Sequence, residues 1–282
     1  MFKSFHHHCV YDPVTHSVLA IWEDHLERAL EYSIVFQSYN PRIFKIDITT
    51  KTVVLDIPVI DFYVQNVNPY CLNYLQFTEH PMDLKNLETI RDDGQPDLFH
   101  INSLSLSKDG TQLMLSLREQ SALMIVDIYQ KRLVKFIKND KMKFQHGCKF
   151  IEDDTKICIF SNNSRFQMVS PNDKLFSAIY ELNLDGEITK TVSESVPMNT
   201  MKCNSSLLPN GNTIACLSCF NTIVEYTPDG EVCWKYYASD APQMYRVEKY
   251  SKAKINNILG VNVLEQLDNS VILSPTGIAI DY

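Results

Sequence analysis

A fourfold internal repeat constrains the fold of this chain more than any other feature. Each copy is an alternating strand, a short polar turn and a second alternating strand, which is the pattern of a β-hairpin. The copies begin at Ile43, Ile125, Ile179 and Ile223 and read IFKIDITTKTVV, IVDIYQKRLV, IYELNLDGEI and IVEYTPDGEV. Two of them place Asp-Gly in the turn, at 185–186 and 229–230, and this dipeptide strongly favours a tight turn.

A second hairpin precedes each copy. These upstream hairpins read VYDPVTHSVLAI from Val10, SLSLSKDGTQLMLS from Ser103, FIEDDTKICI from Phe150 and SLLPNGNTIACL from Ser206. The repeating unit is therefore four strands over roughly 40–50 residues, which is the period of a propeller blade. We expect four such units at about residues 6–57, 98–137, 144–193 and 202–237.

The rest of the chain is less regular. Residues 58–97 contain four prolines and lack clean alternation, which indicates a degenerate blade or a long insertion, with a helix compatible with 82–92. The segment from Val271, VILSPTGIAI, adds at least one further hairpin. Helical periodicity is scarce. The best example, Glu23–Tyr32, is short. We predict one all-β propeller domain over 1–282, with five or six blades if complete; a β-sandwich is the alternative, but it gives no reason for this repeat.

Charge and hydropathy limit the partners. The formal net charge of the 282 residues is −8 and there is no basic stripe, which argues against nucleic acid. No apolar run reaches the roughly 18 residues of a membrane span. The N-terminal MFKSFHHHCVYDP lacks the apolar centre of a signal peptide, so we expect a cytoplasmic protein or a chain without its natural start. An acidic protein that binds an anion must concentrate positive charge locally.

The chain has eight cysteines, most of them inside apolar strand-like runs such as ICIF and ACLSCF. We expect mainly buried free thiols. Cys216 and Cys219 have the CxxC spacing of some metal sites, but they lie in a strand-like run and have no partner pair. The sequence therefore predicts no metal at this position.

Histidines gather at one position of the repeat. The first unit begins with His6–His8, the second with His100, the third with His146 and the fourth with Cys203-Asn204. Five of the eight histidines fall at these starts. Because the innermost strands of a propeller line its central channel, residues at this position converge on the axis from different blades. A lone histidine at a strand start is more often structural, and no Asp or Glu recurs here to complete a metal site, so we expect neither metal nor cofactor.

Two arginines follow these starts. Arg118 lies in LREQS, between two strands of the second unit, and Arg165 lies in NNSR at the corresponding place of the third. A guanidinium group binds tetrahedral oxyanions through paired N–H donors. Arg118 is therefore a candidate anion ligand, with a surface ion pair to Glu119 as the alternative, and Arg165 is a weaker candidate.

These segments together resemble the arylsulfotransferase family. HINS followed by LREQSA is similar to the HxNS and S-R-x-Q-S-A segments of that family, and QHGCKF followed by IFSNNSRF is similar to its QHD and FDNG-R segments. SSLLPNGNTIACLS and EYTPDGEVCWKY resemble its LPNGN and DPDGxxxW repeats, and YRVE at 245–248 is like its YRA segment. The likeness covers about 95–250 and the N-terminal histidines. Gly147 stands where an acidic residue often follows the histidine.

The resemblance implies a propeller enzyme that transfers a sulfuryl group from a phenolic sulfate ester to another phenol, without a nucleotide sulfate donor or other cofactor. It implies a transiently sulfurylated histidine at the channel centre, small aryl sulfates and phenols as partners, and relatives exported by bacteria to the periplasm. A non-catalytic propeller that binds a protein or peptide is the alternative. A lyase or hydrolase that uses a metal in the same channel is a third possibility.

Carried over by position, the resemblance assigns roles to individual residues. His146 matches the nucleophile, His100 and Asn102 match the HxN pair, and Arg118 matches the arginine that follows it. Arg118 and Asn102 would hold the sulfonate oxygens, while His100 would exchange the phenol proton. Further substrate-binding candidates are His7 or His8, between which the register does not decide, Asn204 and Arg165.

Overall fold

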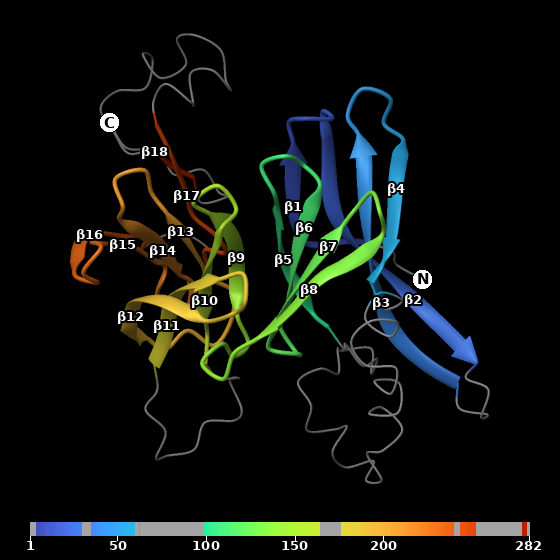
Figure 1. The fold of residues 1–282 in the computed structure, drawn as a ribbon. Coiled ribbons are helices and arrows are strands. Elements are labelled where there is room, and N and C mark those ends of the chain that lie inside the picture. The colour runs from blue at the N-terminus through green and yellow to red at the C-terminus, as the bar shows by residue number, and fades with distance from the viewer. Residues whose placement is uncertain are drawn as a thin grey trace.

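The computed structural model describes residues 4–29, 35–59, 62, 99–163, 176–239, 243–251 and 278–280. The helix expected at 82–92, Arg165, and most of the C-terminal hairpin expected from Val271 lie outside these residues. Within them the strands form four antiparallel four-stranded sheets, in the chain order of the predicted units (Figure 1). The sheets are blades of a β-propeller, as the repeat predicts.

Each sheet is a meander of sequential strands. The first contains β1 (Ser4–Asp12), β2 (Ser17–Ala29), β3 (Val35–Asp47) and β4 (Val53–Pro58). The second contains β5 (Ile101–Leu106), β6 (Gln112–Leu117), β7 (Ala122–Asp127) and β8 (Arg132–Lys138). The third contains β9 (His146–Ile151), β10 (Lys156–Ser161), β11 (Phe176–Asn183) and β12 (Ile188–Pro197). The fourth contains β13 (Asn204–Leu207), β14 (Thr213–Leu217), β15 (Thr222–Tyr226) and β16 (Val232–Tyr237).

Two further strands follow the fourth sheet. β17 (Glu248–Tyr250) pairs in parallel with β18 (Ile278–Ile280). A short 3₁₀ turn, Ser218–Phe220, connects β14 to β15. The helical pattern that begins at Glu23 is not realised as a helix up to Ala29, because every residue from Ser17 to Ala29 pairs with β3 in one unbroken ladder.

The core consists of apolar layers between neighbouring sheets. In β6, Leu113 and Leu115 pack toward the first sheet, whereas Met114 packs toward the third. In β10, Ile159 packs toward the second sheet and Phe160 toward the fourth. A strand that is buried on both faces follows from apolar side chains at successive positions, since neighbours along a strand point to opposite faces.

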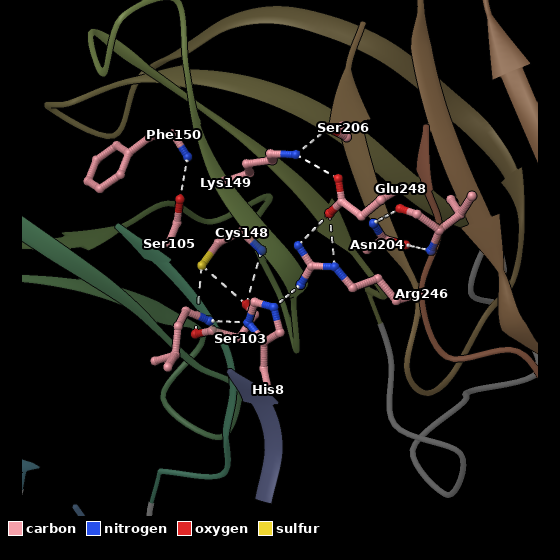
Figure 2. A network of polar contacts seen from close by, with 12 residues as sticks. His8, Ser103, Ser105, Cys148, Lys149, Phe150, Asn204, Ser206, Arg246 and Glu248 are labelled. Atoms are coloured by element: carbon pink, nitrogen blue, oxygen red, sulfur yellow. Dashed lines mark hydrogen bonds and ion pairs between the residues drawn. The ribbon is translucent and has the colours of Figure 1, made fainter. Parts of the chain in front are cut away.

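The first strands of the four sheets lie side by side in the order β1, β5, β9 and β13. Their facing edges carry backbone N–H groups that no neighbouring strand pairs, and side chains satisfy several of them. Ser103 Oγ accepts the N–H of Cys148 at 3.1 Å, and Ser105 Oγ accepts that of Phe150 at 2.9 Å (Figure 2). Short serines on β5 thus hold β9 beside it.

The ring of inner strands is closed by residues 243–250. Asn204 on β13 exchanges two hydrogen bonds with the backbone of Val247, both of 2.8 Å. On the other side, Tyr245 contacts His7 and Arg246 contacts His8, each pair 238 positions apart in the chain. The segment therefore links the fourth sheet to the first.

Seven cysteines are described, and all seven are free thiols. Four are buried, namely Cys148, Cys158, Cys203 and Cys216. The other three are exposed, namely Cys9, Cys219 and Cys233. The expectation of buried thiols therefore applies to only part of the set, because the strand-like runs of the other three present their cysteine to solvent.

Candidate functional site

Three of the four inner strands, β1, β5 and β9, share a local distortion at the end where the histidines lie. The pairing of β1 with β2 shifts between His6 and Cys9, that of β5 with β6 shifts between Ile101 and Ser103, and that of β9 with β10 shifts after His146. The accompanying left-handed backbone is seen at His7 (φ 53°), His100 (φ 43°) and Gly147 (φ 62°). Such β-bulges re-aim side chains and are frequent beside functional sites.

The bulge in β1 brings both His7 and His8 to the inner strands. In a regular strand, consecutive side chains point to opposite faces. Here His7 contacts His100 on the second sheet, while His8 contacts the backbone of Leu104 and the guanidinium group of Arg246. Both histidines therefore reach the inner strands. The backbone of His6 belongs to β1, and its side chain lies outside the described set.

His146 is held in one tautomer. The ring is 3% exposed, and its Nδ1 lies 2.8 Å from Asn162 Oδ1 and 3.2 Å from the carbonyl oxygen of Phe144. The amide nitrogen of Asn162 donates to the carbonyl oxygen of Asn199 at 2.7 Å, which fixes the amide so that Oδ1 faces the ring. Both neighbours of Nδ1 are acceptors, so Nδ1 carries the proton and Nε2 carries the lone pair.

The electrostatic surroundings keep this ring neutral. Burial is the main cause that lowers the pKa of His146 to about 3; the hydrogen bond to Asn162 opposes the shift, and the electrostatic effects of Arg118 and His100 add to it. His146 is therefore an uncharged imidazole throughout the physiological pH range. Its described hydrogen bonds all involve Nδ1, so within this part of the chain Nε2 is available as a nucleophile.

Three side chains from separate segments form a polar chain beside it. His7 Nε2 lies 3.0 Å from His100 Nε2, and the two rings meet edge to face with centroids 4.8 Å apart. The Tyr245 hydroxyl lies 2.9 Å from His7 Nδ1 and 3.3 Å from the carbonyl oxygen of Asn102. Burial raises the pKa of Tyr245, so its hydroxyl keeps its proton. The arrangement can pass a proton between His7 and His100.

Arg118 forms the expected ion pair with Glu119, but the pair is buried. Its Nη1 donates to Glu119 Oε1 at 2.7 Å, and the two side chains are 11% and 3% exposed. Its charge also acts on His146, and its Cζ lies 6.0 Å from the ring centroid of Phe144. The ion pair is therefore an inward one beside the histidine rather than a surface pair.

The two asparagine candidates differ. Asn102 is 1% exposed, and its amide nitrogen donates to the carbonyl oxygen of Gln145 at 2.8 Å. Its Oδ1 is buried without a hydrogen-bond partner in the described structure. Asn204, in contrast, uses both ends of its amide to bind the backbone of Val247. Its contacts are those of a structural link between β13 and the segment that follows the fourth sheet.

A charged network that sequence reasoning did not assign occupies the same ring of strands (Figure 2). Arg246 Nη1 lies 2.7 Å from His8 Nε2, while its Nε and Nη2 donate to Glu248 Oε1 at 3.0 and 2.7 Å. Lys149 Nζ donates to Glu248 Oε2 at 2.8 Å and to Ser206 Oγ at 2.9 Å. Only the resemblance of YRVE at 245–248 drew attention to part of this network, since the segment lies outside the repeat.

A cavity of about 420 Å³ opens beside His7 and His8 of β1. His7 and His8 form its polar wall. The remaining lining is Phe5, Cys9, Val18, Ala20 and Ile46. A mainly apolar cavity with a few polar groups suits an aromatic molecule that carries a polar substituent.

Two searches of the described residues bear on other classes of function. No group of three or more His, Cys, Asp or Glu that could hold a metal ion occurs among them. In the same residues, no helix is long and apolar enough to cross a membrane.

The fold and this cluster define a β-propeller whose inner strands present histidine, arginine and tyrosine from separate segments to one another. A sequence model described as Arylsulfotransferase (ASST) matches residues 36–239. The chain belongs to the arylsulfotransferase family. No curated protein sequence matches it.

Solved structures similar to this chain are distant. Hydrazine synthase of Kuenenia stuttgartiensis is 13% identical with a TM-score of 0.46, over 82% of this chain and 48% of that one. A Bacteroides caccae protein of unknown function is also 13% identical, with a TM-score of 0.42 over 71% of this chain and 55% of that one. A structure of U3-55K is 10% identical, with a TM-score of 0.45 over 83% and 54%. The chain thus spans about half the length of these structures.

Proposed function

We propose that this protein transfers a sulfuryl group from an aryl sulfate ester to a phenol, and that His146 Nε2 carries the group between them. The observation that carries the proposal is the tautomer of His146. Asn162 and Phe144 bind the Nδ1 side of the ring, which directs the lone pair of a neutral imidazole away from them. A neutral imidazole so oriented is a competent nucleophile near pH 7.

In the first half of the reaction, the Nε2 lone pair of His146 forms a bond to sulfur and the bond from sulfur to the aryl oxygen breaks. The electron pair of the broken bond stays on the departing phenolate. The His7–His100 pair, in its singly protonated form, gives that phenolate a proton. The second half is the reverse: the incoming phenol returns a proton to the pair, its oxygen bonds to sulfur, and the nitrogen–sulfur bond breaks.

The sulfonate oxygens need donors that are fixed before the reaction. The charge of Arg118 acts on the pKa of His146. Asn102 lies on the same inner strand, two residues after His100, and its amide is held by Gln145. We assign these two side chains to the sulfuryl oxygens.

The test is a turnover assay with p-nitrophenyl sulfate as donor and phenol as acceptor. Wild-type protein should release p-nitrophenolate and form phenyl sulfate, and His146→Ala should abolish both. The matched control is His16→Ala, because His16 is exposed and its side chain has one described hydrogen bond, to Tyr11; this variant should retain wild-type rates.

A second readout follows the covalent step alone. Wild-type protein quenched after mixing with donor in the absence of phenol should gain the mass of one SO₃ group on His146, and His146→Ala should gain none. A wild-type protein with neither turnover nor this mass gain, across a range of aryl sulfates, would refute the enzymatic proposal and favour the non-catalytic propeller.

A further inference from the structure

The ring of His8 faces a hydrogen-bond donor on each nitrogen. The backbone N–H of Leu104 donates to Nδ1 at 2.9 Å. Nε2 lies 2.7 Å from Arg246 Nη1, which has N–H groups and no lone pair to offer. Figure 2 shows the contact between His8 and Arg246.

A neutral imidazole cannot accept at both nitrogens, because one of them carries a proton. The Leu104 amide lies on the inner edge of β5, and His8 is the acceptor that satisfies it. Nδ1 must therefore keep its lone pair, and the proton resides on Nε2. His8 Nε2 and Arg246 Nη1 then both present N–H groups to each other. This arrangement becomes favourable when a third atom accepts a hydrogen bond from both.

The charges around this pair point to the sign of that third atom. Glu248 is shared by two cations, since its Oε1 binds Arg246 and its Oε2 binds Lys149. Burial, followed by the charge of Arg246, lowers the pKa of His8 to about 3, so the ring adds no charge. Among the described residues, two cations and one carboxylate give this partly buried network a net charge of one positive unit.

The position lies at the wall of the apolar cavity. His8 lines that cavity together with Phe5, Val18 and Ile46. A ligand that satisfies both the donors and the cavity has an anionic oxygen at one end and an apolar ring behind it.

We propose that His8 Nε2–H and Arg246 Nη1 hold the oxyanion of an aryl ligand, at a binding position separate from the one formed by His146 and Arg118. The ligand class is an aromatic sulfonate, sulfate ester or carboxylate. Binding here is an equilibrium property that does not require transfer at His146, so the inference extends beyond the proposed reaction and does not depend on it.

The first test measures the tautomer of His8 directly. In ¹⁵N-histidine-labelled full-length protein at pH 7, with the His8 signals assigned by their loss in His8→Gln, Nε2 should be the protonated nitrogen and Nδ1 the bare one. A protonated Nδ1 would overturn the inference, because Arg246 would then donate to Nε2 and no donor pair would exist. This measurement uses the unaltered protein.

The second test titrates the same signals with benzenesulfonate, a sulfonate that cannot transfer its group to a phenol in this reaction. The Nε2 signal should shift and saturate. Arg246→Gln should weaken the affinity by about tenfold or more, since a charge-assisted donor is lost. Glu248 keeps its ion pair with Lys149 in this variant, which leaves the remaining charges balanced.

The matched control is Arg118→Gln. It should leave the affinity reported by His8 within about twofold of wild type, whereas equal losses in both arginine variants would overturn the separation of the two positions. Inorganic sulfate distinguishes a free anion from an aryl ligand. We expect it to bind more weakly than benzenesulfonate, and equal affinities would refute the role of the cavity.

Discussion

Gly147, directly after His146, offers the sharpest test of how the inner strands approach one another. Its backbone is left-handed, with φ of 62°, and a Cβ atom at this position would lie 2.4 Å from Asn204 Cβ and 2.5 Å from Asn204 Cα. Asn204 cannot move away freely, because its amide holds Val247 by two hydrogen bonds. Gly147→Ala therefore forces β9 and β13 apart.

The cost has two parts. A left-handed backbone costs a residue with a Cβ roughly 1–2 kcal/mol, and overpacking of a tight site costs about 1–3 kcal/mol. Gly211 separates them, because its φ is 84° but its added Cβ would meet only Pro228 Cγ, at 3.6 Å. Gly211→Ala should lose the first part alone. We expect Gly147→Ala to be about 1–3 kcal/mol less stable than Gly211→Ala.

Urea unfolding of wild type and both variants measures this difference as free energies of unfolding. Heating gives the same ranking, at about 2–4 °C in Tm for each kcal/mol in a domain of roughly 150–250 residues. Equal losses in the two variants would refute the close approach. Any side chain at position 147 would add the same Cβ and meet the same contact.

Three further outcomes follow from the site and its supports. Asn162→Ala removes the acceptor that orients His146, and kcat with p-nitrophenyl sulfate should fall about tenfold to a hundredfold, the equivalent of one hydrogen bond to a reacting group; an unchanged kcat contradicts the assigned tautomer. Because the pKa of His146 is lowered to about 3, the unfolded chain takes up this proton first as pH falls below about 6.5, and folding loses stability from there down to about pH 3. Urea unfolding of His146→Gln should therefore show an acid slope shallower by up to about 1.4 kcal/mol per pH unit, and parallel slopes would refute the shift. Lys45 and Asp12 form a buried ion pair at 2.8 Å; Lys45→Met should cost about 3–5 kcal/mol, and adding Asp12→Asn should recover part of it in the same assay.

The alternation of apolar residues predicted the four sheets because it reflects their physical cause directly. A strand between two apolar layers needs apolar side chains at successive positions, as β6 and β10 have, and turns such as Asp185-Gly186 mark where each strand ends. The short helical pattern after Glu23 does not produce a helix up to Ala29. Its periodicity is local, whereas the ladder with β3 supplies a partner for each residue up to Ala29.

The sequence predicted the position of the histidines in the repeat, but not the residues that they contact. Tyr245, Arg246 and Glu248 follow the last regular unit, and they meet His7 and His8 only because the ring of inner strands closes across 238 positions. No local pattern encodes such a contact. The bulge that brings both His7 and His8 to the inner strands depends likewise on one left-handed backbone angle at His7, which the sequence HHHC does not specify.

His8 in β1 and His146 at the start of β9 look equivalent in the sequence, yet their partners give them opposite chemistry. The Nδ1 of His146 faces the acceptors Asn162 and Phe144, so its Nε2 carries the lone pair. The Nδ1 of His8 faces the N–H of Leu104, so its Nε2 carries the proton. The first ring is suited to attack an electrophilic sulfur, and the second to bind an anionic oxygen. We infer that the hydrogen-bond partner of Nδ1 decides whether Nε2 of each histidine carries a lone pair and reacts, or carries a proton and binds an anion.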